Sequence, residues 1–465
     1  MPGKPMRDVI VLLPGITGSV LEKDGREVWA ISAGAAMRAL LSLGRSVKQL
    51  ALTEDPPDVD DLGDGVTAPR IMPDTHLIPG LWKIDGYSKI AARIKAEFDV
   101  TPGDNFFEFP YDWRRDNRVA ARKLARQSHD WLRAWRERSG NDDAKLILVG
   151  HSMGGLVSRY FIECLDGWKD TRMLITFGAP YRGSLNALSF LANGLTKKLG
   201  PITLVDLSAL LRSMTSVYQL LPIYPCYEAG GGGLARVAEA DGVPNVDRDR
   251  AGAALAFHRE IESAVDQHLE DEAYMKDRHA IHPMVGTFQP TLQSARLSEG
   301  RVEMLRTYQG EDQDGDGTVP RVSATPIELS GEAREVFVSE RHGSLQNADP
   351  VLVQVAGVLS GMGLDLSVFR DLVMRISLDL EDAYLPDEPV AVQALSEDEA
   401  ATLTAVAVEV DSGAEVSRGT LPPGGDPWRR LELPPLPPGT YRLTVTADGP
   451  VEPVTDVFAV ISPGD

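Results

Sequence analysis

Cysteine and long apolar runs are both scarce in this 465-residue chain. Its two cysteines, Cys164 and Cys226, are too few for a disulfide framework, so we expect reduced thiols, although composition alone leaves one bridge open. No apolar run reaches the roughly 18 residues that a membrane-spanning helix needs. The N-terminus also lacks the arrangement of a secretory signal peptide. We therefore expect a soluble, cytoplasmic protein.

Basic side chains are scarce relative to acidic ones. The chain has 47 Lys and Arg against 68 Asp and Glu, a formal net charge of −21. Nucleic acid and anionic membrane surfaces both attract clustered Lys and Arg, so we expect neither as a main partner, with transient contact with a lipid surface left open. The hydrophobic content of 43% is enough for a large core, and the length suggests two or three domains.

The chain does contain the pattern of a nucleophile elbow. Gly150-His-Ser-Met-Gly154 follows the apolar run Leu146–Val149 and precedes a helix-like stretch. A strand that turns directly into a helix holds its central residue in a strained conformation, and flanking glycines avoid Cβ clashes. We expect Ser152 to stand exposed at the carboxyl edge of a sheet, with its Oγ at the positive end of the new helix. A chance match is the competing interpretation.

Strands and helices alternate through most of the chain. Apolar runs predict strands at Val9–Leu13, Phe106–Pro110 and Met173–Phe177. Apolar residues at helical spacing predict helices at Ile31–Leu52, Ser88–Phe98 and Val119–Arg138. This alternation predicts an α/β fold, in which a mostly parallel sheet is covered by helices on both faces.

Two regions depart from the alternation. Residues 184–280 combine helix-like pieces with a run of four glycines, so we expect an inserted cap over the site, with a poorly ordered surface excursion as the alternative. After about Val368 the composition changes. Residues 376–465 carry 17 acidic and four basic side chains, with β-rich runs between Pro and Gly turns.

These shifts predict two domains. We expect a catalytic domain at residues 1–367 and an acidic, all-β accessory domain at residues 376–465, an immunoglobulin-like sandwich. The excess negative charge of the second domain favours a protein partner with a basic surface. An equally strong alternative is that this domain only stabilises the catalytic domain.

A serine nucleophile needs a general base, which a carboxylate orients. In folds with this elbow the order along the chain is Ser, then Asp or Glu, then His. The glycine-rich turn Asp314–Pro320 follows a predicted strand and can hold an aspartate. His342 follows the predicted strand Val336–Ser339 and precedes a predicted helix at Pro350–Leu359. The other candidates are His151, which cannot easily reach the neighbouring Oγ, and four histidines in or near the cap: His258, His268, His279 and His282.

Two further motifs have competing interpretations. Asp312-x-Asp314-x-Asp316-Gly317 copies the start of a calcium-binding EF-hand loop, but its twelfth position is Ser323 rather than Glu, and strand-like segments flank it. We therefore expect no metal and no other cofactor. The loop Pro14–Ser19 after the first strand is a candidate oxyanion-hole loop, because its glycines can direct a backbone N–H toward a nucleophile; an ordinary turn is the alternative.

Six motifs in one order resemble the lecithin:cholesterol acyltransferase and lysosomal phospholipase A2 family of α/β-hydrolases, which also includes phospholipid:diacylglycerol acyltransferases. The resemblance covers roughly Arg7 to Gly361. It rests on Pro14-Gly15, Pro110-Tyr-Asp-Trp-Arg-Arg115, Gly150-His-Ser-Met-Gly154, Phe177-Gly-Ala-Pro180 with Gly183, Asp314-Gly-Asp-Gly-Thr-Val319 and His342.

The resemblance implies a role for each site residue. It implies that Ser152 is the nucleophile, Asp316 the acid and His342 the base. It also implies an oxyanion hole formed by the backbone N–H groups of Ile16 and Met153. The secreted members of the family differ from this chain, since they carry a signal peptide and a disulfide-closed lid, and an acidic residue can occupy the position of Ile16.

Members of the family act on acyl esters of lipids, by hydrolysis or by transfer to an alcohol. We therefore predict a serine esterase or lipase that cleaves acyl esters, of lipids or phospholipids, through an acyl-serine intermediate. One alternative is an acyltransferase that moves the acyl group to an alcohol. Another is a catalytically silent lipid-binding or interaction protein that keeps the hydrolase fold.

Overall fold

The computed structural model describes residues 3–29, 47–73, 75–78, 82–199, 202–229, 233–329, 335–361, 374–424, 426–448 and 451–462. The predicted helix at residues 31–52 lies mostly outside these ranges, as does the predicted domain change near residue 368. Among the helices within them, none has the length and hydropathy needed to cross a bilayer. Cys164 and Cys226 are both free thiols.

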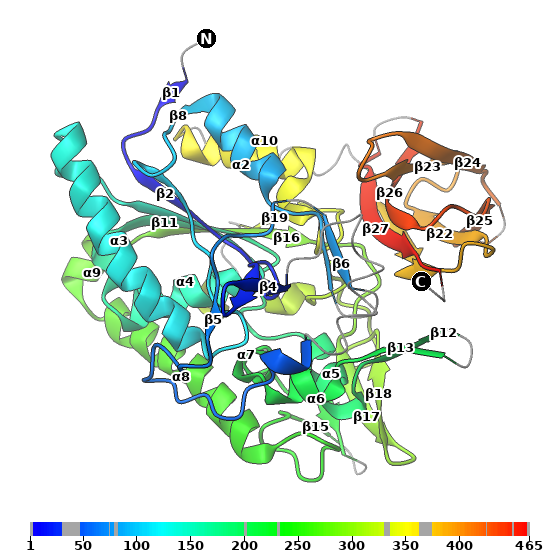
Figure 1. The fold of residues 1–465 in the computed structure, drawn as a ribbon, viewed down its shortest axis with the longest axis horizontal. Helices are drawn as coiled ribbons and strands as arrows, with labels where there is room; N and C mark the ends of the chain where they lie inside the picture. Colours follow the sequence, from blue (N-terminus) through cyan, green and yellow to red (C-terminus); the bar gives the residue numbers. More distant parts are fainter. Residues whose placement is uncertain are drawn as a thin grey trace.

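A six-stranded sheet with every neighbouring pair parallel forms the centre of the molecule (Figure 1). Its strand order is β19-β16-β11-β10-β2-β9. The bounds are β2 Val9–Leu13, β9 Phe106–Glu108, β10 Leu146–His151, β11 Thr171–Phe177, β16 Ala280–Gly286 and β19 Val336–Val338. Strands β2 and β10 are buried at every position, which explains why their residues form nearly unbroken apolar runs.

Helices cover both faces of this sheet. Alternate residues of β2 point to opposite faces: Val9 and Val11 belong to one core cluster, and Ile10 and Leu12 to another. The first cluster contains buried residues of α3 and α4, the second those of α2 and α10. The bounds are α2 Ser88–Glu97, α3 Asn117–Ser139, α4 Met153–Cys164 and α10 Asp349–Leu359. The predicted α/β architecture with a mostly parallel sheet is confirmed.

Strand β16 has no counterpart in the sequence-based prediction. His282 and Pro283 interrupt its apolar residues, and proline lacks the N–H that a central strand uses on both sides. Proline is tolerated here because β19 is short and its pairing begins only at Met284. The missing N–H of Pro283 therefore interrupts no hydrogen bond with β19, because the two strands pair only from Met284 onward.

The segment between Ser184 and Ala280 is built mainly from helices that pack onto the first core cluster. The long helix α8 lies against α4, where the rings of Phe257 and Tyr160 stack with centroids 5.4 Å apart. The other elements are α5 Leu185–Asn193, β12 Thr196–Leu199, β13 Ile202–Asp206, α6 Ser208–Ser213, α7 Thr215–Gln219, β14 Tyr227–Glu228, β15 Leu234–Ala235, α8 Arg248–Leu269 and α9 Glu272–Asp277.

Short strands and turns complete the part at residues 3–361, which is predicted to be catalytic and is called the catalytic part below. β14 and β15 join β17 and β18 in a four-stranded sheet, and small sheets pair β1 with β8, β3 with β4 and β5, and β6 with β7. The bounds are β1 Lys4–Pro5, β3 Leu21–Lys23, β4 Arg26–Trp29, β5 Val66–Thr67, β6 His76–Ile78, β7 Trp82–Ile84, β8 Phe98–Asp99, β17 Ser294–Ser298 and β18 Arg301–Leu305.

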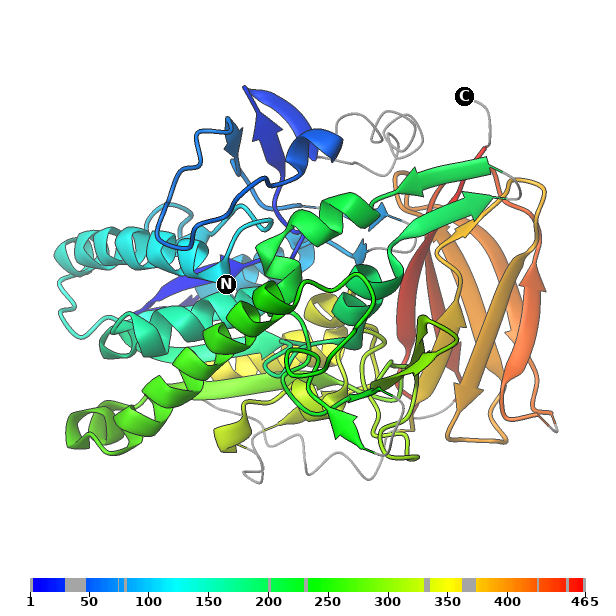
Figure 2. The ribbon, with the colours of Figure 1, turned by 90° about the horizontal axis from the view of Figure 1, so that it is seen from below.

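The C-terminal part consists of a three-stranded and a five-stranded sheet around a core cluster of their own (Figure 2). The predicted β structure is thus confirmed. The three-stranded sheet contains β20 Ile376–Leu380, β22 Val390–Ser396 and β25 Arg429–Leu433. The five-stranded sheet contains β21 Ala383–Tyr384, β27 Val454–Val460, β26 Gly439–Ala447, β23 Leu403–Glu409 and β24 Glu415–Leu421.

Strand β27 joins the two parts of the molecule. Val454 and Phe458 belong to the C-terminal core, whereas Val457 and Ala459 belong to the core cluster of the catalytic part. Because successive side chains of a strand point to opposite faces, one strand contributes to both cores. The C-terminal sheets are therefore packed directly against the catalytic part.

Candidate active site

Ser152 occupies the turn between β10 and α4. Its φ is 52°, a conformation that costs a non-glycine residue roughly 1–3 kcal/mol and that the surrounding structure must maintain. The glycine at 154 is required by close backbone contact, since a Cβ there would come within 2.6 Å of the Pro14 carbonyl oxygen. The elbow therefore presses the start of α4 against the end of β2.

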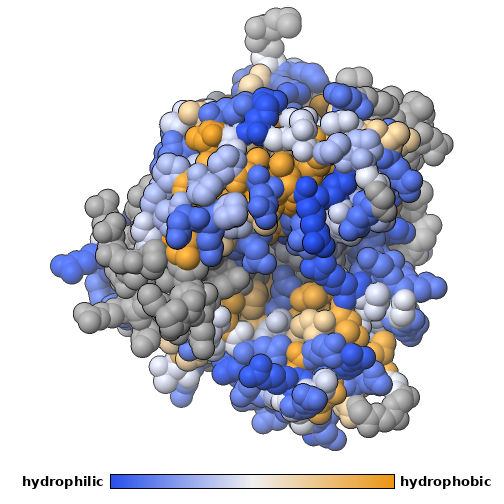
Figure 3. All heavy atoms as spheres, turned by 90° about the vertical axis from the view of Figure 1, so that its right-hand side faces the viewer, coloured by the Kyte–Doolittle hydropathy of each residue, from blue (hydrophilic) through white to orange (hydrophobic). Residues whose placement is uncertain are grey.

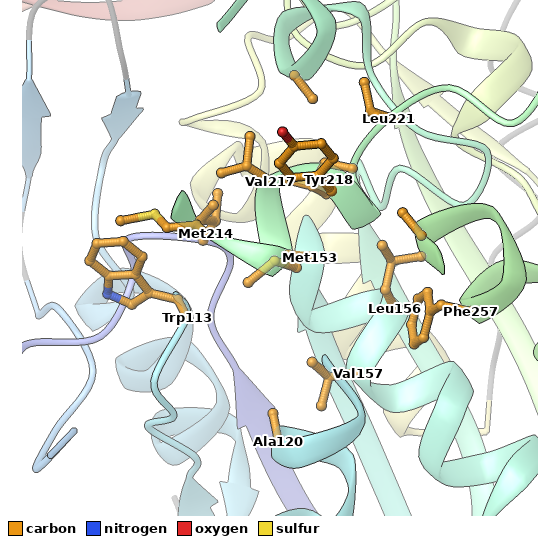
Figure 4. Packing of buried hydrophobic residues seen from close by; sticks show 14 of the residues in the cluster. Trp113, Ala120, Met153, Leu156, Val157, Met214, Val217, Tyr218, Leu221 and Phe257 are labelled. Atoms are coloured by element: carbon orange, nitrogen blue, oxygen red, sulfur yellow. The ribbon is translucent and has the colours of Figure 1, made fainter. Parts of the chain in front are cut away.

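The expectation that Ser152 stands exposed is wrong. Only 3% of the residue is accessible to solvent. Residues from the segment after Ser184 pack beside the elbow, and Figure 4 shows Met153 among Trp113, Met214 and Val217 of the same core cluster. The elbow pattern describes only its own turn, so it carries no information about segments that fold over it later in the chain.

The loops after the elbow bring Asp316 and His342 to Ser152. Nε2 of His342 lies 3.0 Å from Oγ of Ser152, and Nδ1 of His342 lies 2.7 Å from Oδ2 of Asp316. All three residues are buried. Since the carboxylate accepts from Nδ1–H, the hydrogen-bond network assigns the tautomer in which Nε2 is free to accept the serine proton.

Asp316 is held so that one oxygen faces the histidine. Its Oδ1 accepts hydrogen bonds from the backbone N–H groups of Thr318 (2.9 Å) and Val319 (2.7 Å). Its carbonyl oxygen accepts from His342 N at 2.9 Å. The glycine-rich turn therefore orients the Asp316 carboxylate, and Oδ2 is left to pair with His342.

The neighbouring carboxylates of the Asp-rich motif serve other contacts. Oδ1 of Asp314 accepts from the N–H groups of Gly315 and Phe288, and Oδ1 of Asp312 accepts from Gln293 and from Asp314 N. Across the ranges that the structure describes, no three His, Cys, Asp or Glu side chains converge as metal ligands would. The motif here forms a turn in which each carboxylate binds nearby N–H groups.

The loop Pro14–Ser19 lies directly against Ser152. A Cβ on Gly15 would lie 2.9 Å from Cβ of Ser152, so only glycine fits there. Ile16 follows in this loop, and Met153 is the first residue of α4, where a backbone N–H has no intrahelical acceptor. Of the two residues expected to form an oxyanion hole, Ile16 therefore follows a residue that contacts Ser152, and Met153 follows Ser152 itself.

The Tyr-Asp-Trp-Arg-Arg motif holds this loop at both ends. The Tyr111 hydroxyl donates to the Pro14 carbonyl at 2.8 Å, and Trp113 Nε1 donates to the Ser19 carbonyl at 3.0 Å. The motif's arginines point elsewhere: Arg114 pairs with Asp64, and Arg115 with Asp55. These buried cations attach the acidic loop at residues 54–64, which precedes the motif in the chain.

A hydrogen-bond chain through His151 connects three loops, and the sequence analysis missed it. Gly15 N donates to the Tyr87 hydroxyl (2.8 Å), which lies 2.9 Å from His151 Nδ1. Nε2 of His151 lies 3.1 Å from the His342 carbonyl oxygen. Burial, with a smaller contribution from His342, lowers the pKa of His151 to about 3.

The His342 carbonyl oxygen determines which group donates in each of these hydrogen bonds. Because a carbonyl oxygen only accepts, neutral His151 carries its proton on Nε2, and Nδ1 accepts from the Tyr87 hydroxyl. These hydrogen bonds thereby link the loop Pro14–Ser19, the elbow and the loop of His342. No sequence spacing pointed to Tyr87.

A cavity of about 230 Å³ lies beside the acid and the base. Its lining is polar and comes from three parts of the fold. Asn186, Ser189 and Phe190 belong to α5; Lys83, Asp316, Gly317, Thr318, Arg341, His342 and Gly343 belong to the rest of the catalytic part; Asp382 and Asp456 belong to the C-terminal part. The C-terminal part therefore reaches the site itself.

Comparisons with known proteins point to one family. The model of the lecithin:cholesterol acyltransferase family matches residues 52–247. The lysosomal phospholipase A and acyltransferase of Homo sapiens is 28% identical over 155 residues, which are 31% of this chain and 35% of that protein. An uncharacterized protein of Saccharomyces cerevisiae is 27% identical over 176 residues, 37% of this chain and 23% of that protein. The matches thus span about a third or less of these relatives' lengths.

A solved structure of the Tle4–Tli4 complex covers 79% of this chain and 99% of the matched chain, at 14% identity and a TM-score of 0.47. The assignment rests instead on the family match, the lysosomal relatives and the parallel sheet that carries the elbow. The family match and the lysosomal relatives therefore support a lecithin:cholesterol acyltransferase-like family for this chain, at low identity.

Proposed function

We propose that this protein is a serine hydrolase that cleaves acyl esters of lipids through an acyl-Ser152 intermediate. The observation that carries the proposal is the continuous path from Ser152 Oγ through His342 to Asp316, with hydrogen-bond distances of 3.0 and 2.7 Å. A hydroxyl paired with a base that a carboxylate orients is the arrangement that activates serine as a nucleophile.

The reaction follows from this geometry in two halves. His342 Nε2 takes the proton of Ser152 as Oγ bonds to the acyl carbon, and the carbonyl electrons move onto oxygen. Collapse of this intermediate breaks the bond to the leaving alcohol, which receives the proton from His342 and leaves acyl-Ser152. Water then adds to the acyl carbon with His342 again as base, releasing the carboxylic acid and restoring the serine hydroxyl.

The negative charge formed in each half would be bound by the backbone N–H groups of Ile16 and Met153. This role is supported by the Gly15 contact with Ser152 and by the free N–H at the start of α4. Loss of one such donor typically costs about 10²–10³-fold in rate. The stiff attachment of loop Pro14–Ser19 by Tyr111 and Trp113 would keep its donor in place.

The substrate class is proposed from the family and from the surroundings of the nucleophile. The human relative is named a phospholipase A and acyltransferase, which points to a phospholipid acyl ester. The polar cavity next to His342 suits the polar part of such a substrate.

Transfer of the acyl group to an alcohol is the second candidate, because the name of the human relative includes it. The acyl-enzyme is common to both reactions and only the acceptor differs. We propose hydrolysis as the main reaction. Incubation with a defined phospholipid, with and without a simple alcohol, checks this: free fatty acid should dominate, and mainly ester product at low alcohol would favour transfer.

The test of the serine mechanism is Ser152→Ala. Removal of a triad nucleophile costs about 10⁶-fold in kcat in a well-studied protease, so turnover of a short p-nitrophenyl ester and fluorophosphonate labelling should both disappear. Ser263→Ala, at an exposed position of α8, is the matched control and should keep both. Undiminished labelling of the Ser152 variant would exclude it as nucleophile. Failure of the wild type to react with any serine-directed probe would favour a silent lipid-binding protein.

We also propose roles for the remaining parts. Residues 184–280 would act as a cap, since Met214 and Val217 pack beside Met153. Residues 1–367 would form the catalytic domain, and residues 376–465 an immunoglobulin-like sandwich, because two sheets enclose one core. Residues 376–465 carry 17 acidic against four basic side chains, which favours a basic protein partner. The face shown in Figure 3 is mostly hydrophilic, with apolar patches between the polar side chains. The contacts with the catalytic part favour a stabilising role.

A further inference from the structure

We infer that the C-terminal sheets hold the catalytic base in place, with Arg341 as the principal positioning residue. The inference rests on the proposed role of His342 as base. Its basis is that Ser339, Glu340 and Arg341, the three residues before His342, each bond to the C-terminal part. None of these contacts was expected from the sequence.

The first contact is made by Ser339, the residue that follows β19. Ser339 N donates to Oε2 of Glu452 at 2.9 Å, and its hydroxyl donates to the Ile376 carbonyl at 2.8 Å. Gln289 Nε2 donates to the same carbonyl at 2.9 Å. The start of the loop at residues 339–344, called the base loop below, is therefore attached both to strand β20 and to Glu452, two residues before β27.

Glu340 makes the second contact from a buried position. Its Oε1 accepts from Thr455 N at 3.0 Å, on strand β27, and from Arg341 N at 2.8 Å. A buried acceptor that binds two N–H groups fixes the backbone on both sides of it. The residue two positions before His342 is thereby tied to the C-terminal part.

Arg341 makes the third contact and connects the most elements. Nη1 donates to the Leu378 carbonyl on β20 at 2.7 Å, and Nη2 lies 3.3 Å from Oδ2 of Asp456 on β27. Its guanidinium also lies over Gly317, where a Cβ would be 3.3 Å from Cζ. One side chain thus joins both C-terminal sheets to the turn that carries Asp316.

The side of the loop after His342 is held through Lys83. Its Nζ lies 2.9 Å from Asp456 and 2.7 Å from Asp382, both in the C-terminal part. Its backbone touches Gly343 so closely that a Cβ there would be 2.0 Å from the Lys83 carbonyl oxygen. Asp456 therefore binds the cations on both sides of His342.

The base loop needs such support because its own strand is short. β19 pairs with the sheet through only Val336, Phe337 and Val338, and the loop then leaves the sheet. Misplacing a catalytic group by about 1 Å can cost roughly 10²-fold in rate. Contacts from a second part of the molecule would prevent this displacement.

The test compares Arg341→Ala and Arg341→Lys with Arg306→Ala. Arg306 is a matched control, since its Nη2 also meets the C-terminal part, at 3.4 Å from Asp379, but on an exposed surface away from the cavity. We expect Arg341→Ala to lower kcat for a soluble ester about 10- to 100-fold per active site, with KM changed less than about two-fold. Arg341→Lys should restore part of the loss, and Arg306→Ala should match the wild type.

Hydrogen–deuterium exchange over residues 339–344 supplies a measurement that does not depend on activity. Arg341→Ala should speed exchange there, and Arg306→Ala should not. Faster exchange in a wild-type background that hydrolyses no ester would support the positioning while refuting the proposed function. An Arg341→Ala protein with normal kcat per titrated site, or with unchanged exchange in this loop, would overturn the inference, whatever its melting temperature.

Discussion

At the scale of single residues, neutral His151 connects the loop expected to bind the negative charge of the reaction with the loop of the expected base, His342. Its imidazole receives a hydrogen bond from Tyr87 and donates one to the His342 carbonyl, while Tyr87 accepts from Gly15 N. Each donor and each acceptor named in this buried chain has a partner that its chemistry allows. Removal of a single hydroxyl would therefore leave both a donor and an acceptor unpaired.

Tyr87→Phe should impair catalysis without preventing folding. An unsatisfied buried donor costs about 1–3 kcal/mol, and here it lies in the loop of the proposed oxyanion hole. We expect kcat to fall about ten-fold or more, consistent with a partly displaced oxyanion donor, while KM changes little. Tyr160→Phe, which removes a partly exposed hydroxyl bonded to Glu260 at 3.0 Å, is the control. Equal kcat in both variants would show that the chain has no part in catalysis.

Glu340 makes stability depend on pH in an unusual direction for a carboxylate. Burial raises its pKa to about 8, and the charges of Asp456 and Asp85 act the same way, whereas hydrogen bonds from Thr455 and Arg341 oppose the shift. The folded state therefore holds a proton that the unfolded state releases near pH 4.5. The stabilisation is complete below that pH and is lost as pH rises through about 8.

Glu340→Gln should flatten this dependence. Glutamine keeps an oxygen that can accept from Thr455 and Arg341 but does not ionise. Relative to wild type, the variant should gain free energy of unfolding between pH 6 and pH 9 in urea titrations. Glu415→Gln is the control, because that exposed carboxyl, whose pKa Arg418 lowers, is ionised throughout the interval. A constant difference between the Glu340 variant and wild type would contradict the assignment.

At the scale of elements, the contact of α4 with β2 depends on a helix residue without a side chain. Gly154 faces the carbonyl oxygens of Pro14 and Leu13, and a Cβ would approach them to 2.6 and 2.8 Å. Backbone atoms on both sides cannot move aside as a flexible side chain can. Helix α4, which begins at Met153, can therefore approach the loop Pro14–Ser19 only with glycine at this position.

Gly154→Ala should destabilise the fold by about 1–3 kcal/mol through overpacking and should also reduce labelling of Ser152, since the helix start and the loop must separate. Gly252→Ala on α8 is the matched control. A Cβ at that exposed helix position meets nothing within 4 Å, so alanine should raise stability by roughly 0.5–1 kcal/mol. Thermal unfolding and probe labelling check both, and a Gly154 variant as stable and reactive as wild type would refute the argument.

At the scale of the whole molecule, two cores share one strand. Val457, Ala459 and Ile461 are buried in the catalytic core cluster, whereas Val454 and Phe458 fill the C-terminal core. Separation of the two parts would expose the first set to water and break the hydrogen bonds of the base loop. We therefore expect the two parts to unfold together.

Calorimetry of the whole chain should accordingly show one transition. A fragment that ends at residue 361 should melt at a lower temperature and should lose most turnover of soluble esters, because the loop of His342 is no longer held. The Arg306→Ala chain serves as the intact comparison. Two separate transitions, or a fragment with wild-type turnover, would show that the C-terminal sheets are an independent accessory.

Local patterns of the sequence determined the central elements. The apolar runs of β2 and β10 are buried at every position, and the elbow glycine Gly154 meets backbone that leaves no room for a Cβ. The order of Ser, carboxylate and His along the chain selected His342, and the family resemblance selected Asp316. These features were predictable because each depends on neighbouring residues or on a fixed chain order.

Only the tertiary structure decided the rest. The sequence did not predict β16 because the segment contains Pro283. A proline is tolerated there because β19, which is distant in the sequence, starts to pair with β16 only at Met284. The burial of Ser152 depends on segments that fold over the elbow, and the role of Tyr87 depends on its meeting Gly15 and His151 from 72 and 64 residues away. The contacts of Arg341 with Leu378 and Asp456 likewise join parts of the chain that no local pattern relates. A sequence pattern records what a residue requires of its neighbours along the chain, whereas long-range packing determines which residues become its neighbours in space.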